Sequence, residues 1–289
     1  MSQHLKGILI TVLAVIILSP DSVLIRLAEA NDGWTLVFWR GLTYAVVVSI
    51  ILVIMHGSRT AQVCRSIGGG GVWIGLLSGV CTATFVFSIQ NTSIANALVI
   101  ISTAPILIAI VSWFMLGEKA GLATFTSMIL VFIGIYIVMS GNFGGSSLNG
   151  DLFALLTAFI MGFTFTLTRK YREVSMIPTN VLGGVVAALI SAFMAETLYL
   201  APEPRLYIVI SGVLLAVAFS MIVIAPRYMP AAEVGMIMPL ETVLAIIIAW
   251  FVLGEIPSSN AIIGGFVVIV TLFFHAWYST HLARKNNIV

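Results

Sequence analysis

The sequence Trp-Phe-Met-Leu-Gly-Glu at residues 113–118 returns as Trp-Phe-Val-Leu-Gly-Glu at residues 250–255. Each copy ends a long apolar run, and the two copies stand 137 residues apart in a chain of 289. Because this separation is close to half of the chain, the repeat predicts two related halves of one fold. In a hydrophobic protein, paired halves are the usual build of a secondary transporter.

The composition predicts a membrane protein. Hydrophobic residues make up 60% of the chain and charged residues only 8%. A soluble domain carries about a quarter charged residues, so this chain cannot cover a water-facing surface. The apolar runs are continuous rather than alternating, which argues against a transmembrane β-barrel. The few basic residues are scattered along the chain, which excludes nucleic-acid binding.

The apolar runs are long enough for transmembrane helices, which need roughly 20 residues to cross a hydrocarbon core of about 30 Å. Ten runs predict an all-α polytopic membrane protein with ten transmembrane helices and no separate soluble domain. The first run lacks a small-residue cleavage site, so we expect a retained helix rather than a signal peptide. The runs cover residues 6–27, 34–55, 72–91, 95–116, 121–139, 151–168, 178–199, 206–226, 232–253 and 260–280.

The distribution of Lys and Arg predicts the orientation, because short cytoplasmic loops carry an excess of both. With ten spans and a cytoplasmic N-terminus, ten basic residues fall on the inner side and only Arg205 in the outer loops, while Arg26 and Arg40 fall within the first and second runs near their outer ends. We therefore expect both termini in the cytoplasm and the protein in the inner membrane. The inner residues are Lys6, Arg59, Arg65, Lys119, Arg169, Lys170, Arg172, Arg227, Arg284 and Lys285.

Five helices per half is an odd number, so the two halves must insert with opposite orientations. The sequence therefore predicts two inverted five-helix repeats, over residues 1–145 and 146–289. The Gly- and Ser-rich stretch at residues 141–147 is the expected link between them.

These features resemble the ten-helix EamA-type branch of the drug/metabolite transporter superfamily over essentially the whole chain. The two Leu-Gly-Glu endings carry the resemblance most specifically. Pro105 stands where the family usually has a proline in the fourth helix, and Glu241 matches the glutamate of the family's frequent Glu-Pro pair in the ninth. Arg40, within Phe-Trp-Arg-Gly at residues 38–41, looks like the arginine of the family's second helix.

The chain departs from the family pattern at two places that the resemblance assigns to the substrate region. Thr242 replaces the proline expected after Glu241, and Ser19-Pro20-Asp21 stands where many relatives have Trp followed by a small residue. The resemblance implies a transporter, often an exporter of amino acids or other small metabolites. It fixes neither the substrate nor the direction of transport.

Ionisable side chains within the apolar runs are functional candidates, because a charge in hydrocarbon costs a few kcal/mol or more. Glu241 lies near the middle of the ninth run and is the strongest candidate. We expect Glu241, and with it Asp21, to bind a cationic group of the substrate or to carry a coupling proton. The alternative for Glu241 is a hydrogen-bonded carboxyl group that only holds helices together.

One proline interrupts the first run and predicts an opened helix there. Pro20 lacks an N–H group and frees a carbonyl near the middle of the run, beside Ser19 and Asp21. Such backbone survives in a membrane only if it is buried or faces water, so this site is either a cavity wall or a packing kink. Arg40 is the expected counter-ion of Asp21, with a structural ion pair and a carboxylate-binding arginine equally open.

Prolines also interrupt the fourth and ninth runs, which occupy matching places in the two halves. Pro105 lies beside Ser102 and Thr103, and Pro239 precedes Glu241. Paired breaks of this kind point to a binding site, although a tolerated kink satisfied by Ser or Thr is the competing interpretation.

Three further residues complete the predicted site. Trp39 and Tyr44 offer aromatic faces for a ring or a cation, and Trp39 is also suited to anchor at the membrane interface. Gln90 is interpreted as a substrate ligand, as part of an outer gate or as a loop residue.

Together these residues predict a carrier that moves a small polar metabolite, such as an amino acid or amine, by alternating access. The alternatives are efflux of drugs or hydrophobic cations and a membrane sensor or scaffold without transport. We expect no enzyme activity, cofactor or metal site, since no nucleophile–base pair or metal-ligand spacing is present. The expected partners are the substrate, the lipid bilayer and protons, in a monomer or homodimer.

Overall fold

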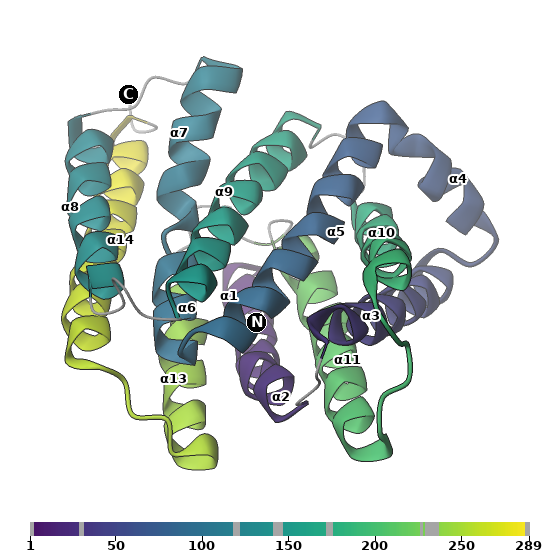
Figure 1. The fold of residues 1–289 in the computed structure, drawn as a ribbon. Coiled ribbons are helices and arrows are strands. Elements are labelled where there is room, and N and C mark those ends of the chain that lie inside the picture. Colours follow the sequence, from purple (N-terminus) through teal and green to yellow (C-terminus); the bar gives the residue numbers. More distant parts are fainter. Residues whose placement is uncertain are drawn as a thin grey trace.

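The computed structural model describes residues 3–28, 32–117, 122–140, 147–171, 176–225, 228 and 237–286. Every regular element in these residues is a helix, as Figure 1 shows. The elements are α1 (Gln3–Leu18), α2 (Asp21–Leu27), α3 (Gly33–His56), η1 (Gly57–Arg59), α4 (Thr60–Ser66), α5 (Gly68–Asn91), α6 (Ile94–Ile101), α7 (Ala104–Leu116), α8 (Leu122–Ser140), α9 (Leu148–Lys170), α10 (Ile177–Met194), α11 (Pro202–Ile224), α13 (Pro239–Leu253) and α14 (Ser259–Asn286).

The described residues contain seven helical stretches long and apolar enough to cross a membrane. Three shorter apolar helices overlap the remaining predicted segments, so the count of ten spans stays a prediction. The long stretches are Leu5–Leu27, Gly33–Ser66, Gly68–Asn91, Ile94–Leu116, Leu148–Lys170, Ile177–Met194 and Pro202–Ile222, and the shorter ones are Ile129–Val138, Leu240–Leu253 and Ser259–Thr271.

The structure corrects two predicted boundaries. The helix expected over residues 178–199 ends at Met194, and Glu196 lies in the following connection, where its N–H group donates to Asp32 Oδ2 at 3.1 Å. The backbone turns away from the helix at Ala195, and the start of α3 holds the connection that follows, because Thr35 Oγ1 also donates to the carbonyl oxygen of Thr197 at 2.6 Å. The segment between the predicted helices 34–55 and 72–91, which holds the inner residues Arg59 and Arg65, is helical through η1 and α4 rather than a loop.

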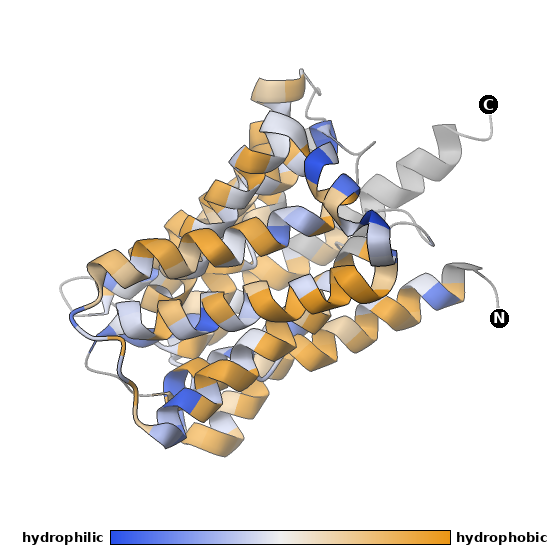
Figure 2. Ribbon diagram, turned by 90° about the vertical axis from the view of Figure 1, so that its right-hand side faces the viewer, coloured by the Kyte–Doolittle hydropathy of each residue, from blue (hydrophilic) through white to orange (hydrophobic). Residues whose placement is uncertain are grey.

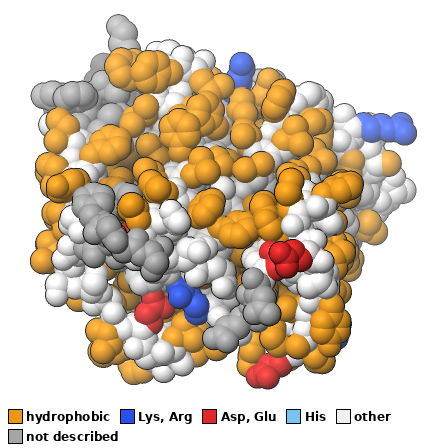
Figure 3. All heavy atoms as spheres, in the orientation of Figure 1, with side chains coloured by type: hydrophobic (Ala, Val, Ile, Leu, Met, Phe, Trp, Pro, Cys, Tyr) orange, Lys and Arg blue, Asp and Glu red, His pale blue; other side chains and the backbone are white. Residues whose placement is uncertain are grey.

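The surface of the molecule is apolar along the lengths of the helices. Figure 2 shows hydrophobic residues along most of each helix, and Figure 3 shows a face with few charged side chains. Phe193, Phe251 and Ile54 expose 86%, 79% and 78% of their surface. Apolar side chains this exposed, and this numerous, require lipid rather than water around the protein.

The helices pack into two bundles that mix the two halves of the chain. Bundle A contains α5, α6, α7 and α9, and bundle B contains α1, α2, α11 and α13. The pair α3 and α10 lies on one side of these bundles, and the pair α8 and α14 lies on the other (Figure 1).

Glycines bring α10 close to both α3 and α5. A Cβ atom at Gly79 would lie 2.6 Å from a methyl group of Val186 and 2.9 Å from the carbonyl oxygen of Gly183. A Cβ atom at Gly41 would lie 2.9 Å from the carbonyl oxygen of Gly184. Gly75, four residues before Gly79, also faces α10, since a Cβ atom there would lie 2.6 Å from the side chain of Leu182. This Gly-xxx-Gly pair in α5 therefore serves close helix packing, as the motif does in membranes.

The two copies of the repeated motif end α7 and α13 with the same turn. Gly117 and Gly254 both adopt the left-handed conformation that ends many helices, with φ of 68° and 67°. The two helices run in opposite directions in Figure 1, α7 ending at the top of the view and α13 at the bottom.

Candidate functional site

The break in the first membrane-crossing stretch places a carboxylate in the protein interior. Helix α1 ends at Leu18 and α2 begins at Asp21, as Pro20 predicts. Both the N–H and the hydroxyl group of Ser19 donate to the carbonyl oxygen of Val15, at 2.9 and 2.7 Å. Asp21 follows in the first turn of α2 with only 2% of its surface exposed.

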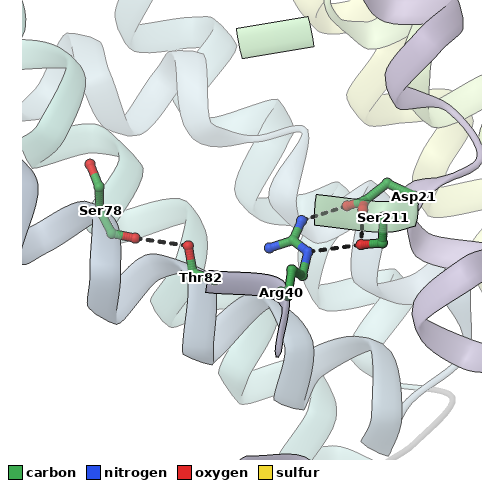
Figure 4. Close-up of polar contacts among 5 residues, drawn as sticks. All are labelled: Asp21, Arg40, Ser78, Thr82 and Ser211. Carbon is green, nitrogen blue, oxygen red and sulfur yellow. Dashed lines mark hydrogen bonds and ion pairs between the residues drawn. The ribbon is translucent and has the colours of Figure 1, made fainter. Parts of the chain in front are cut away.

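Asp21, Arg40 and Ser211 form one buried polar cluster, which Figure 4 shows. Arg40 Nη2 lies 2.6 Å from Asp21 Oδ2, so the two side chains form an ion pair. Arg40 Nε donates to Ser211 Oγ at 3.1 Å, and the Ser211 hydroxyl group donates to Asp21 Oδ1. Each member therefore bonds to both others, which offsets much of the cost of burying the two charges.

Sequence reasoning missed Ser211, although its neighbour carries a signal. A Cβ atom at Gly212 would lie 2.8 Å from Thr43 Cβ and 3.0 Å from the carbonyl oxygen of Arg40. This glycine lets α11 approach α3 at the level of Arg40, and the Ser211 hydroxyl group thereby reaches the ion pair. A Ser-Gly pair inside an apolar run is thus a sequence signal for a polar contact between close helices.

An aromatic ring lies against the guanidinium group of Arg40. The Phe85 ring centroid lies 5.2 Å from Arg40 Cζ, within the range of a cation–π contact. Tyr44, which follows Arg40 by one helical turn on α3, exposes 6% of its surface. Cys81 precedes Phe85 by one helical turn on α5.

Glu241 supplies a second carboxyl group near this cluster. It lies in the first turn of α13, within electrostatic range of both Asp21 and Arg40. Its side chain is half-buried and forms no hydrogen bond or ion pair with the described residues. Since Arg40 and Asp21 balance each other, an ionised Glu241 leaves the centre with one uncompensated negative charge. We call Asp21, Arg40, Ser211 and Glu241 the polar centre.

The predicted break in the fourth segment is confirmed, but its hydroxyl groups bond locally. Helix α6 ends at Ile101 and α7 begins at Ala104, with Pro105 in its first turn. Ser102 donates to the carbonyl oxygen of Val99 at 2.7 Å. Thr103 donates to that of Ile100 at 2.6 Å. Both hydroxyl groups thus stabilise the break itself.

In the second half, α13 begins at Pro239, in agreement with a helix break there. The preceding residues 229–236 lie outside the described part of the chain.

Trp39 and Gln90 contact other parts of the molecule. Trp39 Nε1 donates to the carbonyl oxygen of Leu198 at 3.0 Å. Adjacent side chains on a helix point about 100° apart, so Trp39 points away from the polar centre when Arg40 points toward it. Gln90 Nε2 donates to the carbonyl oxygen of Ile25 at 2.8 Å, where α5 ends beside α2. The structure therefore brings together Asp21, Arg40, Tyr44 and Glu241, and places Trp39 and Gln90 elsewhere.

Comparison with known proteins gives a family and a fold. The model of the EamA-like transporter family matches residues 5–140 and again residues 148–277. A solved crystal structure aligns with 98% of this chain and 99% of its own at a TM-score of 0.67 and 17% identity, which shows a shared fold.

Curated relatives are named as transporters. The uncharacterized transporter YdfC of Bacillus subtilis is 24% identical over 62% of this chain and 61% of its own length. An uncharacterized transporter of Methanothermobacter thermautotrophicus is 24% identical over 67% of this chain and 60% of its own length. The match thus spans about three fifths of both proteins. The S-adenosylmethionine uptake transporter of Rickettsia conorii is 23% identical over 95% of this chain and 93% of its own length.

Proposed function

The chain belongs to the EamA-like transporter family, and we propose that it moves a small polar metabolite with an amine or other cationic group across the inner membrane. Transport is secondary active or facilitative and proceeds by alternating access, with export as the direction. The observation that carries this proposal is the half-buried carboxyl group of Glu241, which forms no ion pair with the described residues beside an ion pair that is already satisfied.

The proposed architecture is ten transmembrane helices in two inverted repeats, residues 1–145 and 146–289, with both termini in the cytoplasm. Two successive matches of one family model support the repeat. The opposite directions of α7 and α13, which end in the same turn, support the inversion. A midplane cavity at the junction of the repeats is the usual substrate site of such carriers.

In the proposed site, Glu241 binds the cationic group of the substrate. A carboxylate that is partly shielded from water attracts a cation more strongly than one at the surface. The neighbouring ion pair fixes the shape of the site, and Tyr44 and Phe85 line it with aromatic surface. When no substrate is bound, a proton on Glu241 neutralises the same charge, which couples transport to the proton gradient.

A hydrophobic cation is the second candidate substrate. The Phe85 ring already lies against one cation, Arg40 Cζ, at 5.2 Å, and aromatic faces together with an acidic group suit a lipophilic cation as well as an amine. Multidrug efflux therefore uses the same residues, and the substrate screen distinguishes the two.

A ligand thermal-shift screen on the purified protein tests the proposed function. Amino acids, amines, nucleosides, lipophilic cations and S-adenosylmethionine form the panel, the last because a relative is named for its uptake. We expect cationic ligands to raise the unfolding temperature of the wild-type protein and to lose this effect in Glu241→Gln. Asp21→Asn should weaken it as well, because the ion pair shapes the site.

Glu203→Gln is the matched control, since Glu203 is an exposed carboxyl group whose hydrogen bond runs to Tyr207 within α11. This variant should respond to ligands as the wild type does. Equal ligand shifts in wild type and Glu241→Gln would sink the proposed site. Ligand-dependent conductance in proteoliposomes that does not saturate would replace the carrier with a channel.

A further inference from the structure

The two bundles are joined by hydrogen bonds at one end of the molecule. Gln90 Nε2 at the end of α5 donates to the carbonyl oxygen of Ile25 in α2. Arg26 of α2 donates to the carbonyl oxygen of Thr92, directly after α5. This is the end at which α2 and α5 finish and α6 begins, and the charge distribution predicts that it faces outward.

The third bond between the bundles uses the repeated motif. Glu255, directly after α13, accepts a hydrogen bond from the N–H group of Ile94 at 2.7 Å. Ile94 is the first residue of α6, whose N-cap Ser93 accepts from Asn96 at 3.1 Å. Glu255 thus satisfies an N–H group that the helix leaves free and places its negative charge at the positive end of the helix dipole.

Bundle A holds the partners of these contacts in place. The Thr92 hydroxyl group donates to Asp151 Oδ1 at 2.6 Å. Thr92, whose carbonyl group binds Arg26, is therefore fixed to α9. A Cβ atom at Gly150 would lie 2.5 Å from the backbone of Asn91 and Thr92, so the start of α9 lies directly against this turn. The Thr92 carbonyl group therefore moves with bundle A, while Arg26 moves with bundle B.

We propose that the contacts of Gln90, Arg26 and Glu255 form the outer gate of the transporter, and that the gate is closed in this conformation. The proposal rests on the proposed alternating-access function. Opening to the outside requires the two bundles to separate at this end, which breaks all three hydrogen bonds. Two of them are charge-assisted, so they are stronger than neutral hydrogen bonds.

The gate contacts favour the outward-closed conformation over the outward-open one, so their loss changes the populations of the two. Loss of one charge-assisted bond lowers the ratio of outward-closed to outward-open molecules by roughly tenfold or more. A rigid rocking motion of the bundles then predicts a linked movement, in which separation at the outer end brings the inner ends together.

Distances between spin labels measure this movement without any substrate. One label pair spans the outer end, at Asn91 of bundle A and Val252 of bundle B, which are both exposed. The other spans the opposite end, at Phe114 of bundle A and Leu9 of bundle B, whose exposed fractions are 77% and 50%.

The measurements use the full-length protein with both native cysteines, Cys64 and Cys81, replaced by serine. We expect Glu255→Ala to shift the outer distance to longer values and the opposite distance to shorter values. Gln90→Leu, a milder change at a neutral hydrogen bond, should shift both distances in the same directions by less.

Thr157→Val is the matched control. It removes a hydrogen bond of 2.8 Å between Thr157 and Thr84, which joins α9 to α5 inside bundle A. Both distances should stay at their wild-type values. Unchanged distances in Glu255→Ala and Gln90→Leu would overturn the gate, as would longer distances at both ends, since they indicate loosening rather than rocking.

The spin-label distances test the gate independently of the substrate screen. A failed screen with linked distance shifts would leave the gate standing and remove the proposed substrate site. Ligand binding that depends on Glu241, combined with unmoved distances, would keep the site and remove the gate.

Discussion

The two ends of the repeated motif are nearly identical in geometry, whereas the two beginnings of the same helices differ in charge. At the ends, the N–H groups of Gly117 and Gly254 donate at 3.1 Å to the tryptophan carbonyl oxygen four residues earlier. The phenylalanines beside the tryptophans expose 77% and 79% of their surface. Local sequence therefore repeats local structure faithfully, even where the helices run in opposite directions.

At the beginnings, Ala104 and Glu241 occupy equivalent places, separated by the same interval as the two motifs. Ala104 is 4% exposed and apolar, whereas Glu241 is a half-buried acid. The repeat thus builds one scaffold twice and installs an ionisable group in one copy only. This asymmetry agrees with the proposed cation site, which requires a carboxyl group in one half only.

The largest effect is expected from a substitution that breaks the ion pair between Asp21 and Arg40, close to Glu241. Arg40→Gln should lower the free energy of unfolding by about 3–5 kcal/mol, because it leaves the buried Asp21 carboxylate without its counter-charge. Unfolding in mixed micelles with increasing dodecyl sulfate measures the change. The double variant with Asp21→Asn should recover much of the loss, since no buried charge remains.

An Arg40→Gln protein as stable as the double variant would contradict this view of the pair. Its Asp21 carboxyl group would then have to be neutral or solvated in the folded protein. A double variant no more stable than Arg40→Gln alone would assign the loss to packing around Ser211 instead.

The sequence predicted those features that are costly in lipid. Charges and proline breaks within apolar runs demand compensation, and so the Asp21–Arg40 pair and the breaks at Pro20 and Pro105 could be expected from the order of the residues alone. Serine carries no such cost, because its hydroxyl group can donate to the carbonyl oxygen of the preceding turn, as in Ser49. Ser211 itself therefore gives no sign of its role in the sequence, and only Gly212 beside it indicates a close helix contact.

The direction of a side chain was also beyond the sequence. Trp39 and Arg40 are neighbours in the chain, but the rotation of α3 about its axis points only Arg40 to the polar centre. The rotation follows from close contacts such as that of Gly41 with α10, which connect residues far apart in the sequence. The gate contact of Glu255 depends in the same way on where α6 lies.

An intermediate effect is expected from giving both halves a carboxyl group. Ala104→Glu should destabilise the protein by about 2–3 kcal/mol, because it buries an acid without a partner. Glu241→Gln should change stability by less than about 1 kcal/mol, since the native carboxyl group forms no hydrogen bond with the described residues that would be lost. The same micelle titration compares the two variants, and a stable Ala104→Glu protein would show that position 104 faces a polar cavity.

The smallest effect tests the equivalence of the motif ends. Gly117→Ala and Gly254→Ala should each cost about 1 kcal/mol, because a Cβ atom is strained at positive φ. Gly69→Ala is the control, since a Cβ atom there meets no other atom within 4 Å and its backbone is not left-handed. Equal losses of unfolding free energy at positions 117 and 254 would show that the two turns contribute equally to stability. A larger cost at 254 would show that its turn also positions Glu255 against Ile94, so that the excess measures the gate contact.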